Sequence, residues 1–190
     1  HLSLRRQRQM CIRDSYTSGS TGRPKGVLSS QKGVIATMFS WACYSSVLGE
    51  VASRSDPDAT PLVSPDLAIL HCVPLFHVTG SHAGLLMSIL AGRKIVMMKK
   101  WDAGEALKLI QDEQISDITG VPTQTWELLN HPARNDYDLS SLKTLGGGGG
   151  PRPSEHVKLL NEEFEGQPGI GYGLSETNAL ATLCLSLIHI

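Results

Sequence analysis

The stretch DITGVPTQTWELLN, residues 117–130, joins a short run with β-branched residues to a longer run in which apolar residues have helical spacing. A charged residue and a proline bound the first run, 117–121, which is typical of a strand. The second run, 123–130, is predicted to be a helix. A strand followed by a helix is the repeating unit of a parallel sheet covered by helices.

The same alternation extends in both directions from this stretch. Strands are predicted at residues 67–73, 94–98, 142–145 and 169–172, and helices at 31–48, 80–90, 103–113 and 154–164. Asp102 and Ser154 are predicted N-caps, and the polar, proline-rich residues 50–66 a surface loop. The sequence therefore predicts an α/β fold, a partial and mostly parallel sheet flanked by helices.

Composition excludes several classes of protein. The 190 residues are 41% hydrophobic, enough for one globular domain, and the 17 basic and 18 acidic residues nearly balance, which disfavours nucleic acid as a partner. The four cysteines are scattered without a C-x-x-C pair, which indicates neither a zinc site nor a disulfide framework and favours a cytoplasmic location. The longest apolar run falls short of the roughly 20 residues of a membrane span.

The two ends differ from the rest of the chain. Residues 1–15 are basic and lack both periodicity and the apolar core of a signal peptide, and residues 184–190, CLSLIHI, form an apolar tail without a cap or turn signal. Both resemble translated sequencing-adaptor read-through. We therefore expect native sequence at residues 16–183 and non-native segments at 1–15 and 184–190, the alternative being natural but poorly ordered termini.

The strongest local signal is YTSGSTGRPKGV, residues 16–27. Glycines let backbone N–H groups approach a phosphate, hydroxyl groups donate further hydrogen bonds, and Lys25 supplies a positive charge for the β- and γ-phosphates. A Walker A motif needs glycine directly before the lysine, whereas Arg23 and Pro24 stand there, which disfavours a kinase or GTPase. A phosphate-binding loop is predicted, with a flexible Gly/Ser loop as the alternative.

This segment resembles the phosphate loop of the adenylate-forming (AMP-binding) superfamily, which includes acyl-CoA synthetases, aryl-CoA ligases, luciferases and peptide-synthetase adenylation domains. Three more segments are similar to motifs of that family: GYGLSET at 171–177, GGGGGPRP at 146–153, and VPLFHVTG at 73–80. The resemblance covers nearly all of residues 16–183 and implies a central fragment of the family's large N-terminal domain.

The resemblance implies a role for each matching residue. Thr17 and Glu176 would hold Mg²⁺, whose preference for oxygen ligands fits them. Ser175 would bond the α-phosphate, and His77 would lie near the reacting carboxylate. The implied catalytic residues are Lys25, His77 and Glu176, and the implied nucleotide-binding residues are Thr17, Ser18, Gly19, Ser20, Thr21, Gly22, Lys25, Gly147, Gly148, Gly171, Tyr172, Gly173 and Ser175.

Other histidines and apolar stretches are assigned no chemistry. His71, His77 and His82 are spaced by six and five residues, which places them on no common helical face and disfavours a metal site. Residues 80–92 are interpreted as ordinary core that could also line an acyl tunnel. Trp41 and Trp126 are interpreted as packing aromatics.

The activity implied by the resemblance is ATP-dependent activation of a carboxylic acid to an acyl-adenylate, followed by thioester formation with coenzyme A. A fatty acid or a related carboxylic acid is expected, because PLFHVTG, the glycine-rich loop and the absence of an amino-group-binding aspartate in residues 67–78 favour it within this family. An aryl-acid CoA ligase, a carrier-protein-loading adenylation domain and a non-catalytic nucleotide-binding module are the alternatives. We expect the chain to lack the strand feeding the phosphate loop, the ribose-binding acid and the C-terminal lysine domain, and to be inactive alone.

Overall fold

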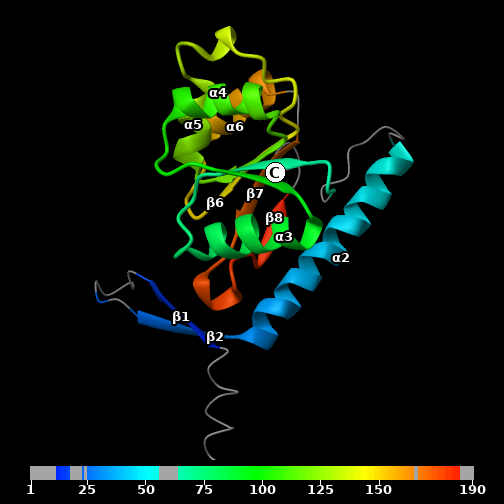
Figure 1. The fold of residues 1–190 in the computed structure, drawn as a ribbon, viewed down its shortest axis with the longest axis vertical. Coiled ribbons are helices and arrows are strands. Elements are labelled where there is room, and N and C mark those ends of the chain that lie inside the picture. The colour runs from blue at the N-terminus through cyan, green and yellow to red at the C-terminus, as the bar shows by residue number, and fades with distance from the viewer. Residues whose placement is uncertain (1–11, 18–22, 24, 56–63, 165–166, 185–190) are drawn as a thin grey trace, which may run out of the picture.

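The computed structural model describes residues 12–17, 23, 25–55, 64–164 and 167–184 (Figure 1). A two-stranded antiparallel hairpin is formed by β1 (Ile12–Thr17) and β2 (Lys25–Ser30). The other strands form one six-stranded sheet in the order β4-β3-β5-β6-β7-β8. These strands are β3 (Ala68–His71), β4 (Lys94–Met97), β5 (Asp117–Gly120), β6 (Thr144–Gly148), β7 (Gln167–Tyr172) and β8 (Thr182–Cys184).

The first five strands of this sheet run parallel, and β8 pairs antiparallel with β7. Helices connect the parallel strands, because such strands need a crossover connection. The predicted α/β fold with a mostly parallel sheet is confirmed. The five strands predicted from the sequence all form, although β6 extends further toward its glycine-rich end than expected.

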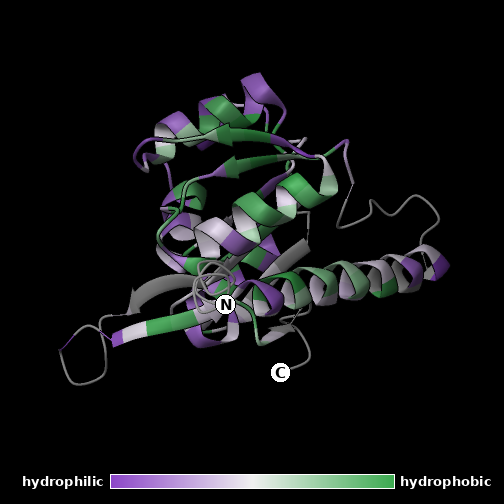
Figure 2. Ribbon diagram, turned by 60° about the horizontal axis from the view of Figure 1, so that its bottom comes forward, coloured by the Kyte–Doolittle hydropathy of each residue, from purple (hydrophilic) through white to green (hydrophobic). Residues whose placement is uncertain are grey.

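Helices cover the two faces of the sheet unequally (Figure 1). On one face lie α4 (Ala103–Glu113), α5 (Pro122–Leu129) and α6 (Ser154–Glu163). The other face is covered by the π-helix η1 (Thr79–Leu86) and α3 (Met87–Ala91), which follow one another directly. The long helix α2 (Gln31–Ser55) runs obliquely, and its residues alternate between polar and apolar along its length (Figure 2). Two short 3-10 helices are η2 (Arg134–Asp136) and η3 (Ser175–Thr177).

The main core lies between the sheet and α4, α5 and α6. Ile118 on β5 and Leu145 on β6 are almost completely buried there. Leu107, Leu128 and Leu160, one from each helix, meet them with 1% exposure or less. Burial of each such side chain stabilises the fold by about 1.5–3 kcal/mol, so this face of the sheet supplies most of the apolar packing.

Close backbone approach explains where η1 begins. A Cβ on Gly80 would collide with the carbonyl of Pro74, and a Cβ on Gly84 would lie 2.5 Å from Nδ1 of His71. Only glycine therefore allows this helix to sit directly on the end of β3. The predicted helix at 80–90 is confirmed in position, but its first two turns have π rather than α geometry.

The structure corrects two predictions about helix ends. Pro153, not Ser154, is the N-cap of α6, because the Pro153 carbonyl already accepts the first helical hydrogen bond from Val157 N–H at 3.1 Å. The predicted loop 50–66 is wrong at its start, because α2 continues to Ser55 before any proline and is supported by an ion pair from Arg54 to Glu50 at 3.2 Å. Asp102 is confirmed as an N-cap, since its Oδ1 accepts from Glu105 N–H at 2.9 Å.

The expectation that no strand feeds the phosphate loop is also wrong. β1 ends at Thr17, directly before the loop, and β2 begins at Lys25, directly after it, so these two residues face each other in the hairpin. The residues of β1 include β-branched and aromatic types, which favour extended backbone. Residues 12–15, which we expected to be non-native, belong to this strand; their origin stays a prediction. None of the helices in the described part of the chain has the length and apolar character needed to cross a bilayer.

Candidate functional site

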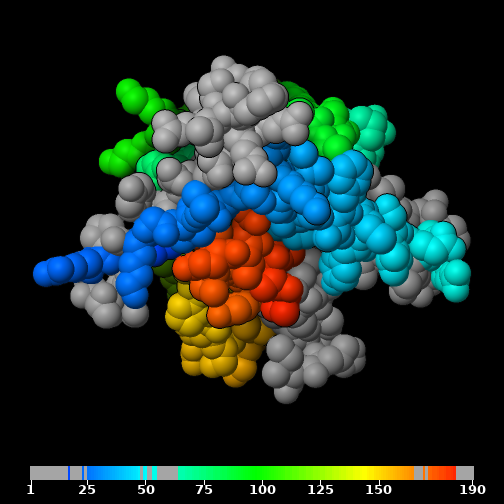
Figure 3. All heavy atoms as spheres, turned by 90° about the horizontal axis from the view of Figure 1, so that it is seen from below, coloured from blue at the N-terminus to red at the C-terminus, as the bar shows by residue number. Residues whose placement is uncertain are grey.

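A cleft of about 710 Å³ lies on the face of the sheet that turns away from α4, α5 and α6. Its walls come from α2 through Trp41 and Tyr44, and from η1 through Thr79 and Ala83. Figure 3 shows β2 and the first turns of α2 crossing directly beside the segment 167–184. The cleft is therefore enclosed by segments from widely separated parts of the sequence.

Glycines of β6 and β7 form the floor of this cleft. Because side chains alternate along a strand, Gly146 and Gly148 share the cleft face of β6, and Gly169 and Gly171 share that of β7. The close pairing of these strands itself requires glycine at one point, since a Cβ on Gly148 would lie 2.7 Å from the carbonyl oxygen of Gly171. The floor is consequently flat backbone on which a planar or bulky ligand group can lie.

Gly147 occupies a different position from the floor glycines. Its backbone borders the cleft, but its Cβ would point toward the other face and lie 2.7 Å from Nη2 of Arg152. The guanidinium nitrogens of Arg152 are buried there, and burial lowers the pKa of this group. Both predicted glycines of this loop, Gly147 and Gly148, thus lie at the cleft.

A sharply specified turn follows β7 at the carboxyl edge of the sheet. A Cβ on Gly173 would collide with the carbonyl of Ala179, and Ala179 itself has a positive φ of 95°. Thr177 holds the turn closed, because its Oγ1 accepts from Leu174 N–H at 3.0 Å. Such over-determined, strained backbone is typical of functional sites.

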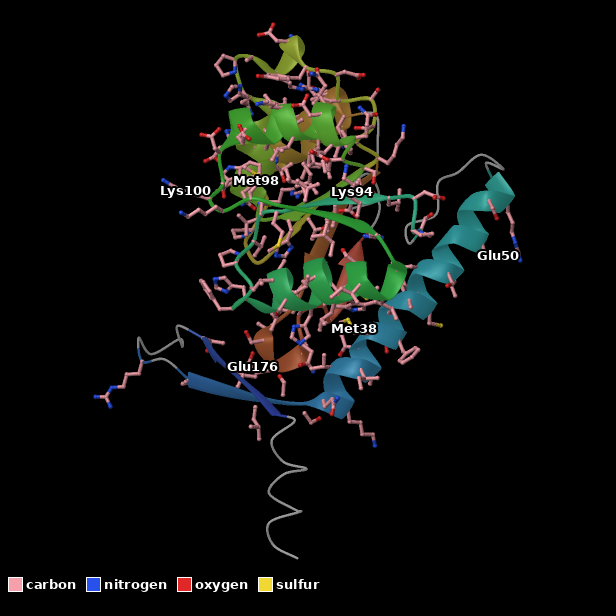
Figure 4. The ribbon with its side chains drawn as sticks, viewed as in Figure 1. Met38, Glu50, Lys94, Met98, Lys100 and Glu176 are labelled. Carbon is pink, nitrogen blue, oxygen red and sulfur yellow. The ribbon has the colours of Figure 1, made fainter. Side chains whose placement is uncertain are left out.

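This turn carries two of the predicted site residues. Ser175 and Glu176 both line the cleft from η3, which packs against β2. Figure 4 shows Glu176 on the side of this segment that lies toward the β1–β2 hairpin. Thr17, the last residue of β1, lines the same cleft. The structure therefore brings Thr17 and Glu176, separated by most of the sequence, to one site.

The remaining residues of the phosphate loop are only partly described. Lys25 is exposed at the start of β2, opposite Thr17 but not among the residues that line the cleft. Ser18, Gly19, Ser20, Thr21 and Gly22 lie outside the described residues. Tyr172 is 64% exposed and, unlike its neighbours Gly171 and Gly173, does not line the cleft.

His77 lies at the cleft in the turn between β3 and η1. Its ring contacts that of Phe76 at a centroid distance of 4.5 Å. Its carbonyl accepts hydrogen bonds from N–H and Oγ of Ser81, at 2.9 and 3.0 Å, which fixes the backbone at the start of η1. His71 and His82 are buried beneath the same segment, away from the exposed His77.

At the amino ends of the strands, the cleft has a polar end that the sequence interpretation missed. Arg93 Nη1 lies 3.3 Å from Oδ2 of Asp117, and these side chains are only 7% and 11% exposed. Thr119 Oγ1 donates to Oδ1 of Asp117 at 3.1 Å. Burial raises the pKa of Asp117, while Arg93 and Thr119 act in the opposite direction. The sequence does contain a signal for this polar end. Asp117 and Thr119 alternate with Ile118 on β5, so both lie on the strand face opposite the apolar one.

Ligands of α/β proteins bind at the carboxyl edge of an open, mostly parallel sheet, and the cleft reaches this edge, where Thr17, Ser175 and Glu176 line it. Together with the glycine- and hydroxyl-rich sequence that follows Thr17, this arrangement is typical of a nucleotide-binding α/β protein. The family model described as "AMP-binding enzyme" matches residues 14–189. The chain belongs to this family of AMP-binding enzymes, as its motifs predicted.

Its relatives include CoA ligases from bacteria and plants. The chain is 32% identical over 170 residues to the 3-[(3aS,4S,7aS)-7a-methyl-1,5-dioxo-octahydro-1H-inden-4-yl]propanoyl:CoA ligase of Mycobacterium tuberculosis, covering 89% of this chain and 30% of the relative. It is 30% identical over 173 residues to 4-coumarate–CoA ligase CCL1 of Humulus lupulus, covering 90% and 29%. The chain thus spans about 30% of the length of these relatives.

Solved structures show the same fold. The inhibitor-bound N-terminal domain of FACL13 from Mycobacterium tuberculosis superposes with a TM-score of 0.74 at 26% identity, over 91% of this chain and 39% of that one. ATP-bound MatB from Rhodopseudomonas palustris also gives a TM-score of 0.74, at 21% identity, over 90% and 30%. The predicted fold, part of the N-terminal domain of an adenylate-forming enzyme, is confirmed.

Proposed function

We propose that the full-length enzyme containing this chain activates a carboxylic acid with ATP to an acyl-adenylate and then transfers the acyl group to coenzyme A. The observation that carries this proposal is the convergence of Thr17, Glu176 and the glycine floor of β6 and β7 on one cleft. The CoA ligases among the relatives support the thioester product. The scattered cysteines support a cytoplasmic location.

The cleft suits a nucleotide at its carboxyl edge. The floor glycines carry no side chains and so leave room for a flat base over β6 and β7. Gly147, Gly171 and Gly173 would surround this base, the exposed Tyr172 ring would have to turn toward it, and Ser175 would donate to the α-phosphate. The loop from Thr17 to Lys25 would hold the outer phosphates with its backbone N–H groups, its hydroxyls and the lysine ammonium.

Thr17 and Glu176 fit a magnesium ion in the donor atoms that they offer. A hydroxyl and a carboxylate on one cleft wall are oxygen donors, and Mg²⁺ is commonly held by one or two carboxylates together with substrate phosphates. When bound, Mg²⁺ supplies positive charge that offsets negative charge on the phosphates. Glu176 would hold this charge in place.

The chain's own residues would position the acid and balance charge during the reaction. A carboxylate oxygen attacks the α-phosphorus of ATP, and the bond from that phosphorus to the pyrophosphate oxygen breaks. Lys25 would stabilise the pyrophosphate charge as it develops, and His77 would border the carboxylate. The thiolate of coenzyme A then attacks the acyl carbon and releases AMP.

The body of the acid would lie beside η1, where the cleft wall is mostly apolar. Val73, Val78, Ala83 and Met87 line this part, which fits the hydrocarbon of a fatty acid, the substrate class expected from the sequence. An aryl acid is the second candidate, because a 4-coumarate–CoA ligase is among the relatives and a ring could lie on the glycine floor.

Exchange of labelled pyrophosphate into ATP tests this function. We expect exchange only when a carboxylic acid is present, and AMP as the nucleotide product once coenzyme A is added. Lys25→Met should lower the rate strongly, whereas Lys32→Met, which removes an exposed lysine of α2 outside the cleft, should not. Acid-independent hydrolysis of ATP to ADP would contradict the proposal.

A further inference from the structure

The polar end of the cleft, defined as Arg93, Asp117, Thr119 and Thr144, lies at the opposite end of the strands from the proposed nucleotide site. Asp117 and Thr144 are paired in register at the start of β5 and β6, whereas Gly148 ends β6. Four residues of strand separate these two levels, a distance of roughly 13 Å. An acid whose carboxylate lies at the carboxyl edge of the sheet would need a body of about this length to bring its distal atoms to the polar end.

The side chains of Arg93 and Asp117 are largely buried, those of Thr119 and Thr144 are partly exposed, and all four residues line the cleft. Asp117 accepts from both Arg93 and Thr119, at 3.3 and 3.1 Å. A carboxylate offers about four lone-pair sites, so Asp117 can accept a hydrogen bond from a ligand in addition to those from Arg93 and Thr119. An apolar ligand tail would remove water from these groups without replacing its hydrogen bonds, which is unfavourable.

The floor beside the polar end is wide enough for a branched or cyclic acid. A Cβ on Gly169 would meet no atom within 4 Å, although the residue is buried, and a Cβ on Gly146 would make only ordinary contacts, the nearest with Thr119 Oγ1 at 3.7 Å. Both positions are therefore open space in the cleft rather than sites of close backbone approach.

We infer that the substrate is an acid with an apolar body whose distal end carries an uncharged hydrogen-bonding group, a hydroxyl or a carbonyl, recognised by Arg93, Asp117 and Thr119. This inference rests on the proposed function and specifies its acid. The opposite charges of Arg93 and Asp117 balance, so a second carboxylate or an amine would bury a charge without a dedicated partner. A plain fatty acid would leave the polar end without a ligand partner.

Matched acids test the inference in the full-length enzyme by acid-dependent pyrophosphate exchange. Nonanoate, 9-hydroxynonanoate, 8-oxononanoate and nonanedioate share a chain length, and cinnamate and 4-hydroxycinnamate share a ring. We expect kcat/KM for the hydroxy or oxo acid to exceed that for its plain counterpart at least about tenfold, because a site built to hydrogen-bond a ligand discriminates against the analogue that lacks the group. The hydroxy and oxo arms distinguish the two groups.

Thr119→Val tests the named residues, since it removes a hydroxyl and nearly preserves shape. We expect it to reduce about tenfold the ratio of kcat/KM for the polar-tailed acid to kcat/KM for the plain acid. Thr182→Val, an exposed position on β8 outside the cleft, is the matched control and should leave this ratio and both kcat/KM values unchanged. Asp117→Asn is a second variant, in which the amide keeps one acceptor oxygen but removes the carboxylate charge. It should also reduce the preference for the polar-tailed acid.

Three results would overturn the inference while leaving the proposed function intact. These are equal or higher kcat/KM for the plain acids, preference for nonanedioate, and a polar preference that Thr119→Val and Asp117→Asn both leave unchanged. Absence of exchange with every acid would instead contradict the proposed function and, with it, the inference.

Discussion

The two faces of the central sheet use the same strands for different purposes. On β5 and β6, Ile118 and Leu145 point into the core beneath α4, α5 and α6, with exposures of 2% and 0%. Asp117, Thr119 and Gly146 alternate with them and line the cleft. Because the side-chain period of a strand is two, each strand is divided residue by residue into a packing half and a binding half.

This division means that stability and binding are set by neighbouring residues. The core face is filled with large apolar side chains, whereas the cleft face carries glycines, threonines and a buried ion pair. A register slip by one residue would exchange the two faces, so the apolar half fixes the register on which the binding half depends.

Adjacent substitutions on β6 give the largest expected contrast. Leu145→Ala should lower the free energy of unfolding by about 2–5 kcal/mol, because it leaves a cavity in a fully packed core. Gly146→Ala should change it by less than about 1 kcal/mol and in the stabilising direction, since the new Cβ makes no close contact and the unfolded chain loses freedom. Urea unfolding measures both.

The order of the two variants should be reversed for substrate binding, where Gly146→Ala should have the larger effect on KM. Gly146→Ala places a methyl group in the cleft and should raise KM for ring-bearing acids, whereas Leu145→Ala should leave KM of the folded fraction nearly unchanged. Equal losses of stability in the two variants would show that the cleft face is packed as tightly as the core.

Glu176→Gln should lower the activity of the cleft without changing the stability of the core. Loss of the carboxylate removes the proposed magnesium ligand while preserving shape, so the rate of pyrophosphate exchange should fall about 100-fold, equivalent to about 2.7 kcal/mol. Stability should be unaffected because Glu176 is exposed. Raising free Mg²⁺ should recover part of the rate, and Glu162→Gln, at an exposed position of α6, should leave it unchanged. Unchanged turnover and Mg²⁺ dependence in Glu176→Gln would remove Glu176 from the site.

The packing half of the molecule could be predicted from the sequence because its signals are local. α4 occupies the predicted residues 103–113, with Asp102 as its cap, and β5 lies within the predicted 117–121. Apolar periodicity and capping residues act within a few positions of one another, so tertiary contacts were not needed to place these elements. The cleft glycines and Glu176 were found through motif resemblance.

The rest depends on contacts between distant residues. Arg93 directly precedes β4, so its ion pair with Asp117 spans β3, which lies between β4 and β5, and no local pattern indicates this pair. The position of η1 depends on the close approach of Gly84 to His71, and β1 acquires its partner only when Lys25 returns beside Thr17. Trp41 was interpreted as a packing aromatic, but the path of α2 places it at the cleft.

The smallest expected effect concerns the one carboxylate that β5 buries on the cleft face. Burial raises the pKa of Asp117 above its ordinary value of about 3.9, although Arg93 and Thr119 oppose this shift. The folded chain therefore keeps this proton to a higher pH than the unfolded chain does. Its contribution to stability is fully present below the unfolded pKa and is lost as pH rises through the folded pKa.

Asp117→Asn isolates this contribution, because the amide stays neutral at every pH and Arg93 stays charged. The free energy of unfolding of the original chain minus that of the variant, measured by urea titration across a pH series, should decrease as pH rises above about 4, by at most about 1.4 kcal/mol per pH unit, and then level off. A difference that instead increased with pH over this range would show that attraction to Arg93 outweighs burial. The ion pair would then stabilise the fold, and the polar end would belong with the packing half of the sheet rather than with the binding half.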